Sequence, residues 1–376
     1  MPRYQSGVPN LIMHELILPR NTDSMSAALE TVTENTSSSK TYSIPRLREV
    51  LSAYYRRSTA IAVALLAGDI ALFGLGEWLV ATRGLGWQVL GCILATLAII
   101  RLFIIGHDAC HGSLTDHDGL NKVLGRIAFL PSLTPYSLWR VGHNVVHHGF
   151  NSLKGRDFVW EPKDPSEWAE LSPARRVLER LYRSAAGPLP YYMFEIWWRR
   201  LYYPRGKNKP GDRAEFFWDS TLVTVFAALW VGGLVMFAKG SLPVALVLGF
   251  LVPFLVWNWT VGFVVYLHHT HPDFVWYSDK TSWLKEQGIL HGTVRYRIRP
   301  WWNFLLHNIM EHAAHHLDAK IPLYRLKAAQ TALANLVPEI PEIELSMRTY
   351  WRTVKECKLF DFDRKVWVRF PKSSRV

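Results

Sequence analysis

The chain has 376 residues and a net charge of +12, and 49% of its residues are hydrophobic. Its 17 Trp, its 15 Tyr and its long uncharged stretches are typical of one membrane-embedded domain rather than of two or three soluble domains. The three cysteines, Cys92, Cys110 and Cys357, exclude a disulfide framework, and the lack of a Cys-x-x-Cys pair excludes a zinc ribbon. In a membrane protein the positive charge indicates anionic lipid or an acidic protein partner, and we expect no binding to nucleic acid.

Residues 1–45 are polar, rich in Ser and Thr and without an apolar run, so we expect a disordered tail. This stretch also lacks the apolar centre of a signal peptide, and its acidic residues argue against a transit peptide. The domain itself is expected over residues 46–345. Residues 346–376 are expected to form a C-terminal cytoplasmic tail.

Four apolar segments are long enough to cross a bilayer, which takes about 20 helical residues. They lie at 58–82, 84–106, 216–238 and 241–267. Asp69 lies within the first segment, and because a carboxylate is costly in lipid we expect it to pack toward another helix. Arg101, near the end of the second segment, is expected to lie near the cytoplasmic interface, where its default role would be to extend its side chain to the membrane surface.

The segment between the second and third spans, residues 112–215, is expected to stay on one side of the membrane. Residues 123–139 are apolar but are interrupted by Pro131 and Pro135, which favours an interfacial or re-entrant hairpin over a span. Residues 171–203 mix arginines with Tyr and Trp, which is typical of a helix in the headgroup layer.

The distribution of basic residues predicts the topology. Only Arg83 and Lys239 fall in the two short turns that join the spans in pairs, so nearly all Lys and Arg lie on the opposite side. The positive-inside rule makes that side cytoplasmic. The sequence therefore predicts an all-α membrane protein with four transmembrane helices, both termini in the cytoplasm and a cytoplasmic helical cap, in a bacterial inner membrane.

Histidines gather in three clusters at the ends of apolar segments: His107-Asp-Ala-Cys-His111, His143-Asn-Val-Val-His147-His148 and His312-Ala-Ala-His315-His316. A single histidine pair at this spacing usually occurs by chance, but three histidine clusters on the same side of the membrane predict a shared metal site. Because i and i+4 share a helix face, His107 with His111 and His143 with His147 are each expected to aim at one point. The adjacent His315 and His316 differ by about 100° and can serve different metals. Neutral imidazoles favour one or two redox-capable transition metals.

These three motifs resemble the histidine boxes of the membrane fatty acid desaturase family, most closely its acyl-lipid Δ12 (omega-6) members. The context agrees: Gly106 and Ser113 flank the first box, Trp139-Arg140 precede the second, and His307-Asn-Ile309 precede the third. Residues 266–272, Tyr-Leu-His-His-Thr-His-Pro, resemble the motif that ends the last span in that subgroup. Two features depart from the plant relatives: His268 replaces a Gln, and the second box has one more residue between its histidines.

The resemblance implies two non-haem iron ions that activate O2 to desaturate a fatty acyl lipid. The implied metal ligands are His107, His111, His143, His147, His148, His269, His312, His315 and His316, with His271 as the competitor of His269. His117, His291 and His307 are expected outside the ligand set. Four acidic residues lie close to the boxes in the sequence: Glu311, Asp108, Asp157 and Asp318. Each is expected either to orient a histidine ligand or to be a solvated surface residue.

Electrons must come from a separate ferredoxin or cytochrome b5, because the chain has no His-Pro-Gly-Gly motif, no dinucleotide-binding glycines and no ferredoxin cysteines. The double-bond position and the acyl carrier stay open. A di-iron hydroxylase, ketolase or epoxygenase would share the boxes. A haem cytochrome or a metal transporter is disfavoured, since both would place their functional residues near mid-membrane.

Overall fold

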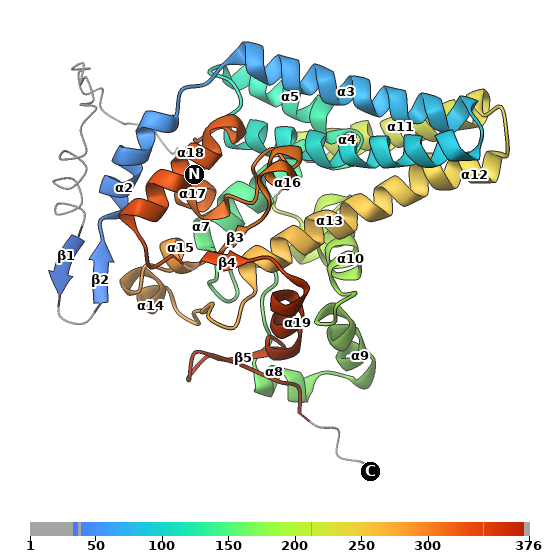
Figure 1. Cartoon of the computed structure of the whole chain (residues 1–376). Coiled ribbons are helices and arrows are strands. Elements are labelled where there is room, and N and C mark those ends of the chain that lie inside the picture. Colours follow the sequence, from blue (N-terminus) through green and yellow to red (C-terminus); the bar gives the residue numbers. More distant parts are fainter. Residues whose placement is uncertain (1–32, 37–38, 212, 341, 372–376) are drawn as a thin grey trace.

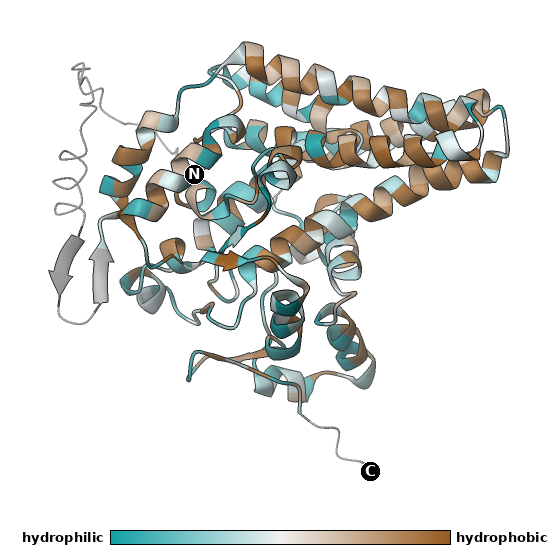
Figure 2. Cartoon of the chain, viewed as in Figure 1, coloured by the Kyte–Doolittle hydropathy of each residue, from teal (hydrophilic) through white to brown (hydrophobic). Residues whose placement is uncertain are grey.

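The computed structural model describes residues 33–36, 39–211, 213–340 and 342–371, so most of the expected N-terminal tail lies outside the described residues. Four long helical segments run side by side, and the shorter elements gather around the end at which α4 and α13 finish (Figure 1). The long helices are predominantly hydrophobic, whereas the shorter elements mix polar and apolar residues (Figure 2). The protein is thus mostly helical, as the sequence predicts.

The four predicted spans are confirmed as apolar helices of membrane-crossing length. They are α3 (Thr59–Thr82), α4 (Leu85–His111), α11 (Ala214–Phe237) and the continuous segment Leu242–His269, which consists of α12 (Leu242–Leu246), the π-helical η5 (Val247–Leu251) and α13 (Val252–His269). At 1.5 Å per residue these helices exceed the roughly 30 Å hydrocarbon layer. Two of them continue into the histidines, because α4 ends at His111 and α13 at His269.

The ends of α3 and α4 follow from local chemistry. The side chain of Ser58 accepts a hydrogen bond from the backbone N–H of Ile61 and caps α3. Gly112 ends α4 with a φ of 68°, a left-handed conformation that glycine adopts without strain. The two helices pack closely where Gly76 faces Gly91, since a Cβ on Gly91 would lie 2.5 Å from the carbonyl oxygen of Gly76.

Asp69 connects α3 to α4 and to the cap. Asp69 is 3% exposed, and its Oδ1 lies 2.6 Å from Arg101 Nε while its Oδ2 lies 2.9 Å from His307 Nε2. The expectation that Asp69 packs toward another helix is therefore confirmed. The side chain of Arg101 does not take its default role, because it donates to Asp69 Oδ1 and to the carbonyl of Leu305.

Between α4 and α11 the chain forms only short helical segments. They are α5 (Asp118–Phe129), α6 (Tyr136–Arg140), the π-helical η2 (Val141–His147), α7 (His148–Phe150), α8 (Pro165–Glu170), α9 (Pro173–Tyr182), α10 (Pro188–Pro190), the π-helical η3 (Tyr191–Leu201) and η4 (Gly206–Asn208). The break expected at Pro131 and Pro135 is the connection between α5 and α6. Residues 171–203 form three consecutive segments rather than one helix.

The rest of the cap comes from both ends of the chain. Before α3 lie the strands β1 (Thr33–Thr36) and β2 (Ser39–Tyr42), then α2 (Ile44–Leu51) and η1 (Ser52–Tyr54). After α13 lie α14 (Lys280–Lys285), α15 (Gly288–His291), β3 (Arg295–Arg297), α16 (Pro300–Leu305), α17 (His312–Leu317), α18 (Leu323–Leu336) and β4 (Glu342–Glu344). The strands β1 and β2 pair antiparallel, and β3 pairs parallel with β4.

The segment expected as a C-terminal tail packs on the cap. It forms α19 (Met347–Glu356) and the antiparallel strands β5 (Leu359–Asp361) and β6 (Val366–Val368). Phe360 is fully buried, the hydroxyl of Tyr350 donates to the carbonyl of Ala185 at 2.7 Å, and Trp367 Nε1 donates to the carbonyl of Phe274 at 2.9 Å. These contacts hold residues 347–368 beside the end of α13.

Candidate metal centre

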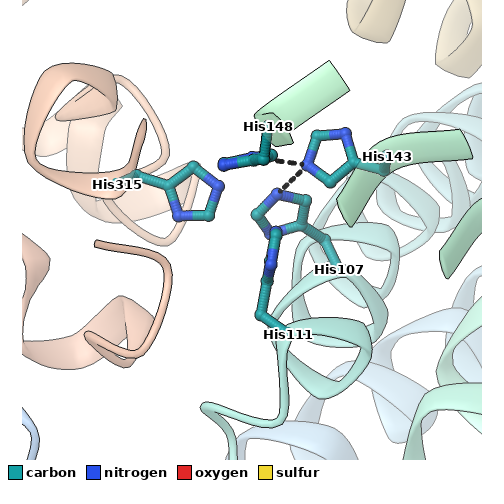
Figure 3. A group of neighbouring side chains, drawn as sticks. All are labelled: His107, His111, His143, His148 and His315. Atoms are coloured by element: carbon teal, nitrogen blue, oxygen red, sulfur yellow. Dashed lines mark hydrogen bonds between the residues drawn. The ribbon is translucent and has the colours of Figure 1, made fainter. Parts of the chain in front are cut away.

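Five of the predicted histidines form one cluster, which we call the five-histidine cluster. Its members come from α4, from the η2–α7 segment and from α17: His107, His111, His143, His148 and His315. One ring nitrogen from each lies within 4.8 Å of the others, and the rings point toward one another (Figure 3). The Nε2 atom of His143 is 2.9 Å from Nε2 of His107 and 3.1 Å from Nε2 of His148.

The other four predicted histidines form a second group, the four-histidine cluster. It consists of His147 from η2, His269 from the end of α13, and His312 and His316 from α17. All four are buried, and the Nε2 atom of His269 lies 3.2 Å from Nε2 of His147 and 3.1 Å from Nε2 of His312. The structure therefore brings together all nine predicted histidines, divided between two neighbouring groups.

The division corrects one expectation from the sequence. His107 and His111 share a cluster as predicted, but His143 and His147 do not. The segment Val141–His147 is π-helical, and the backbone N–H of His148 donates to the carbonyl of His143, five residues earlier. In this geometry residues five apart lie on one face, so His143 shares the five-histidine cluster with His148 while His147 turns to the other cluster. His315 and His316 serve different clusters, as their spacing predicts.

The donor set fits a transition metal in each cluster. Nitrogen ligands about 2 Å from one ion lie about 3 Å apart when adjacent, close to the separations of 2.9 to 3.2 Å seen here. Several ring nitrogens are buried without a hydrogen-bond partner among the described residues, namely Nε2 of His111, His315 and His316 and Nδ1 of His312. A buried orphan nitrogen is costly unless something binds it. Imidazole donors without carboxylates suit iron, copper or zinc rather than magnesium or calcium.

Burial keeps these imidazoles neutral. Desolvation lowers the pKa of His143, His148, His312, His315 and His316 well below the usual value, and repulsion from the neighbouring imidazoles lowers it further. A metal ligand must present an unprotonated nitrogen. The clusters therefore hold their donors in the state that binds a metal at neutral pH.

Two of the four nearby acids contact the clusters. Asp157 is fully buried, and its Oδ1 lies 3.0 Å from Nδ1 of His147. Asp108 Oδ1 lies 3.3 Å from Nδ1 of His107, while its Oδ2 accepts from the backbone N–H of Leu323 at 2.6 Å. Both carboxylates occupy the positions from which a partner fixes the orientation and tautomer of a ligand.

Glu311 and Asp318 bond elsewhere. Glu311 accepts from Arg295 Nε at 3.0 Å and from Asn303 Nδ2 at 2.8 Å, which ties together the loop before α17. Asp318 contacts the hydroxyl of Tyr55 and accepts from the backbone N–H of Lys320 at 3.0 Å. Both acids are buried, which excludes the alternative that they are solvated surface residues.

The remaining histidines of the described residues lie outside both clusters. His271 accepts from the backbone N–H of Asp273 through Nδ1 at 3.2 Å, so the structure brings His269 rather than His271 to the metal ligands. His117 precedes α5, His291 ends α15, and His307 bonds to Asp69. Sequence reasoning missed the position of His268, which is fully buried and stacks on His312 with ring centroids 4.1 Å apart.

A narrow, mostly apolar cavity of about 30 Å³ adjoins both clusters. His143, His147, His269 and His312 line it, together with aromatic residues from the 158–160 segment and from η3: Phe158, Trp160, Tyr191 and Tyr192. These aromatic residues carry no motif and come from two separate segments, so the sequence held no signal for them. An apolar chain that enters this cavity would contact the histidines that line it.

Comparison with known proteins agrees with this arrangement. The family described as "Fatty acid desaturase" matches residues 85–351, and the chain belongs to this family. It is 27% identical over 322 residues to the sn-1 oleoyl-lipid 12-desaturase of Anabaena variabilis, covering 82% of this chain and 86% of that protein. It is 25% identical over 300 residues to the chloroplastic omega-6 fatty acid desaturase of Glycine max, covering 79% of this chain and 68% of that protein.

The match spans α4, the cap segments of both clusters, α11, α13 and α17. The protein is therefore a membrane enzyme of the oxidoreductase class, a fatty acid desaturase.

Proposed function

We propose that this enzyme introduces a double bond at the Δ12 (omega-6) position of oleoyl lipids, using O2 and two iron ions. The observation that carries the proposal is the convergence of nine imidazoles, seven of them buried, as a group of five and a group of four, beside a mostly apolar cavity. The relatives from Anabaena variabilis and Picosynechococcus, each 27% identical, are both oleoyl-lipid 12-desaturases, which favours the same bond position here.

In this proposal the five-histidine cluster holds one iron and the four-histidine cluster holds the other. Iron held there would supply the reduction of O2 and, with it, the power to oxidise an unactivated C–H bond, which no side chain can provide. The chain's own contribution is to orient His107 and His147 through Asp108 and Asp157 and to exclude water by burial.

The substrate enters the apolar cavity with its methylene chain against Phe158, Tyr191 and Tyr192. The present volume of about 30 Å³ holds little more than one methylene group, so these side chains must change conformation to admit an acyl chain. The distance from the mouth of the cavity to the histidines then selects the carbon that is oxidised. A shift of one methylene changes the binding free energy by only about 1–3 kcal/mol, so regiochemistry depends on wall residues rather than on the histidines.

Both histidine clusters lie at the ends of α4 and α13, which the charge distribution assigns to the cytoplasm. A cytoplasmic ferredoxin or cytochrome b5 would deliver the two electrons needed in each cycle. The net charge of +12 favours an acidic donor.

Expression in a host that makes oleoyl lipids but no linoleoyl lipids tests the proposal. We expect linoleoyl lipids to appear, with the bond located by mass spectrometry of derivatised fatty acids. A new bond at Δ9 or Δ15 would refute the Δ12 position, and a hydroxy acid as the sole product would refute desaturation as its reaction.

Iron content tests the metal assignment separately. The purified protein should carry close to two irons per chain, and His147→Ala and His315→Ala should each lower the iron content and abolish product formation, because each removes a donor from a different cluster. His117→Ala is the control, since His117 lies outside both clusters. If both His147→Ala and His315→Ala retained the iron content of the wild type, the ligand assignment would be refuted.

A further inference from the structure

A second and larger cavity, of about 650 Å³, lies away from both histidine clusters. It is open to the surface and is lined by residues 203–206, Lys209 and Arg213 and by the first turns of α11, including Phe216, Phe217 and Ser220. One wall is therefore basic and the other apolar. A smaller cavity of about 330 Å³ shares Tyr203 and Arg205 with it and extends toward Trp198.

Two arginines of the basic wall, Arg205 and Arg213, have no close acidic partner within the described residues. Residues 203–213 contain four basic residues and one acidic residue. Arg205 is exposed and has no acidic partner within the part of the chain that the structure describes. Arg213 lies over the ring of Phe216, and its contact with the carboxylate of Glu215 is long, at 3.5 Å, with 60% of the Arg213 side chain exposed. Such cations attract a phosphate or another anion.

Ser220 provides a second observation that points to a ligand. It lines the cavity and is 1% exposed, yet its hydroxyl has no hydrogen-bond partner among the described residues. Its neighbours on α11 behave differently: the hydroxyls of Thr221 and Thr224 each donate to the backbone carbonyl four residues earlier, at 2.9 and 2.7 Å. The buried hydroxyl of Ser220 is thus available to donate to a bound oxygen.

The position of the cavity indicates which anion reaches it. α11 is one of the four helices of membrane-crossing length, and the cavity lies at its N-terminal end, where backbone N–H groups and the helix dipole favour phosphate. Phe217 and Trp218 are 57% and 64% exposed there, and Trp198 is 57% exposed beside the smaller cavity. Exposed aromatic residues at the end of a span mark the headgroup layer of a bilayer.

We propose that this cavity binds the phosphate group of an anionic membrane glycerophospholipid. The phosphate lies between Arg205, Arg213 and the hydroxyl of Ser220, while the acyl chains pass along Phe217 and the outer face of α11. This site is independent of the metal centre, so its occupancy can be measured on protein with or without iron.

The test measures phospholipid retention by the purified full-length protein in neutral detergent, using native mass spectrometry. Phosphatidylglycerol is the probe, and a galactolipid with the same acyl chains but no phosphate is the comparison. We expect one phosphatidylglycerol to bind tightly and the galactolipid to bind weakly. Arg205→Gln should weaken phosphatidylglycerol binding about tenfold, the usual effect of losing one charged hydrogen bond. Ser220→Ala should also weaken it, without lowering the melting temperature.

Arg348→Gln is the matched control, because Arg348 is exposed on α19, far along the chain from the cavity, and its loss changes the net charge equally. Binding unchanged in both Arg205→Gln and Ser220→Ala, or equal retention of the galactolipid, would overturn the proposal. Inorganic phosphate and coenzyme A are added in a separate arm. Displacement of the lipid by either at low millimolar concentration would show that the cavity takes a soluble phosphate ligand, which also overturns the lipid assignment.

Discussion

Replacing Asp157 by Asn tests whether the carboxylate behind His147 acts on the four-histidine cluster. Asp157 is fully buried, its Oδ1 lies 3.0 Å from Nδ1 of His147, and it accepts from the backbone N–H groups of Ser152 and Val159 at 3.1 and 3.0 Å. Asn has nearly the same shape but carries no charge, and one of its two polar atoms is a donor. It cannot accept from all three groups at once.

The size of the effect follows from this geometry. Loss of the partner that orients a metal-bound histidine lowers metal affinity or activity about 10- to 100-fold, or about 1.4 to 2.8 kcal/mol. We therefore expect Asp157→Asn to lose iron from the four-histidine cluster at chelator concentrations that leave the wild type loaded. The assay is iron content after dialysis against graded chelator, together with product formation in cells.

A second carboxylate and imidazole pair provides the control. Asp273 Oδ2 lies 3.5 Å from Nδ1 of His271, outside both clusters and with 65% of the Asp273 side chain exposed. Asp273→Asn removes the same charge from the same kind of pair, and we expect its iron retention to equal that of the wild type. The reasoning is refuted if the Asp157 and Asp273 variants retain iron equally well across the chelator series.

Three further outcomes follow from the structure. Asp69→Asn should lower the melting temperature in detergent markedly, because breaking a buried pair such as that with Arg101 costs about 3 kcal/mol or more. Asp116→Asn is the control and should have little effect, because it loses only the contact of the exposed Asp116 side chain with Arg57. Metal-free protein should lose stability below about pH 6.5, because the unfolded chain then binds protons while the cluster histidines whose pKa is lowered by burial stay unprotonated in the folded state. The expected loss is about 1.4 kcal/mol per pH unit for each such histidine. A thermal-melting profile that is flat from pH 7 to 5 would contradict this. A tag at residue 150 should be accessible only from the cytoplasm and one at residue 240 only from outside, and labelling of intact cells at residue 150 would overturn the predicted orientation.

The spans could be predicted because a membrane helix is defined by length and composition, both of which are visible in the sequence. The charged residues in those spans were harder. Asp69 was correctly expected to face protein, since lipid offers it no partner. Its bond to His307 and the bond from Arg101 to the carbonyl of Leu305, however, each join residues more than two hundred positions apart. No local pattern indicates such a contact.

The candidate site, like the spans, could be predicted only in part. Which histidines gather was predictable from their spacing and their place at the ends of apolar helices. How they divide was not, because the expectation for His143 and His147 assumed α-helical geometry, and the sequence Val-Gly-His-Asn-Val-Val-His shows no sign of its π-helical backbone. The aromatic walls of the narrow cavity come from separate segments, which only the fold brings together.

The π-helical turn of η2 also bears on how box lengths are compared between relatives. The second box here has one more residue between its histidines than the plant version. In an α-helix a residue shares its face with the fourth residue after it, and in a π-helix with the fifth. The extra residue is thus absorbed within a single turn, so that His148 still faces His143 and the flanking helices need not rotate. Chains whose boxes differ in length by one residue can therefore present the same imidazoles to the same point, and an alignment gap inside this motif is no measure of a changed metal site.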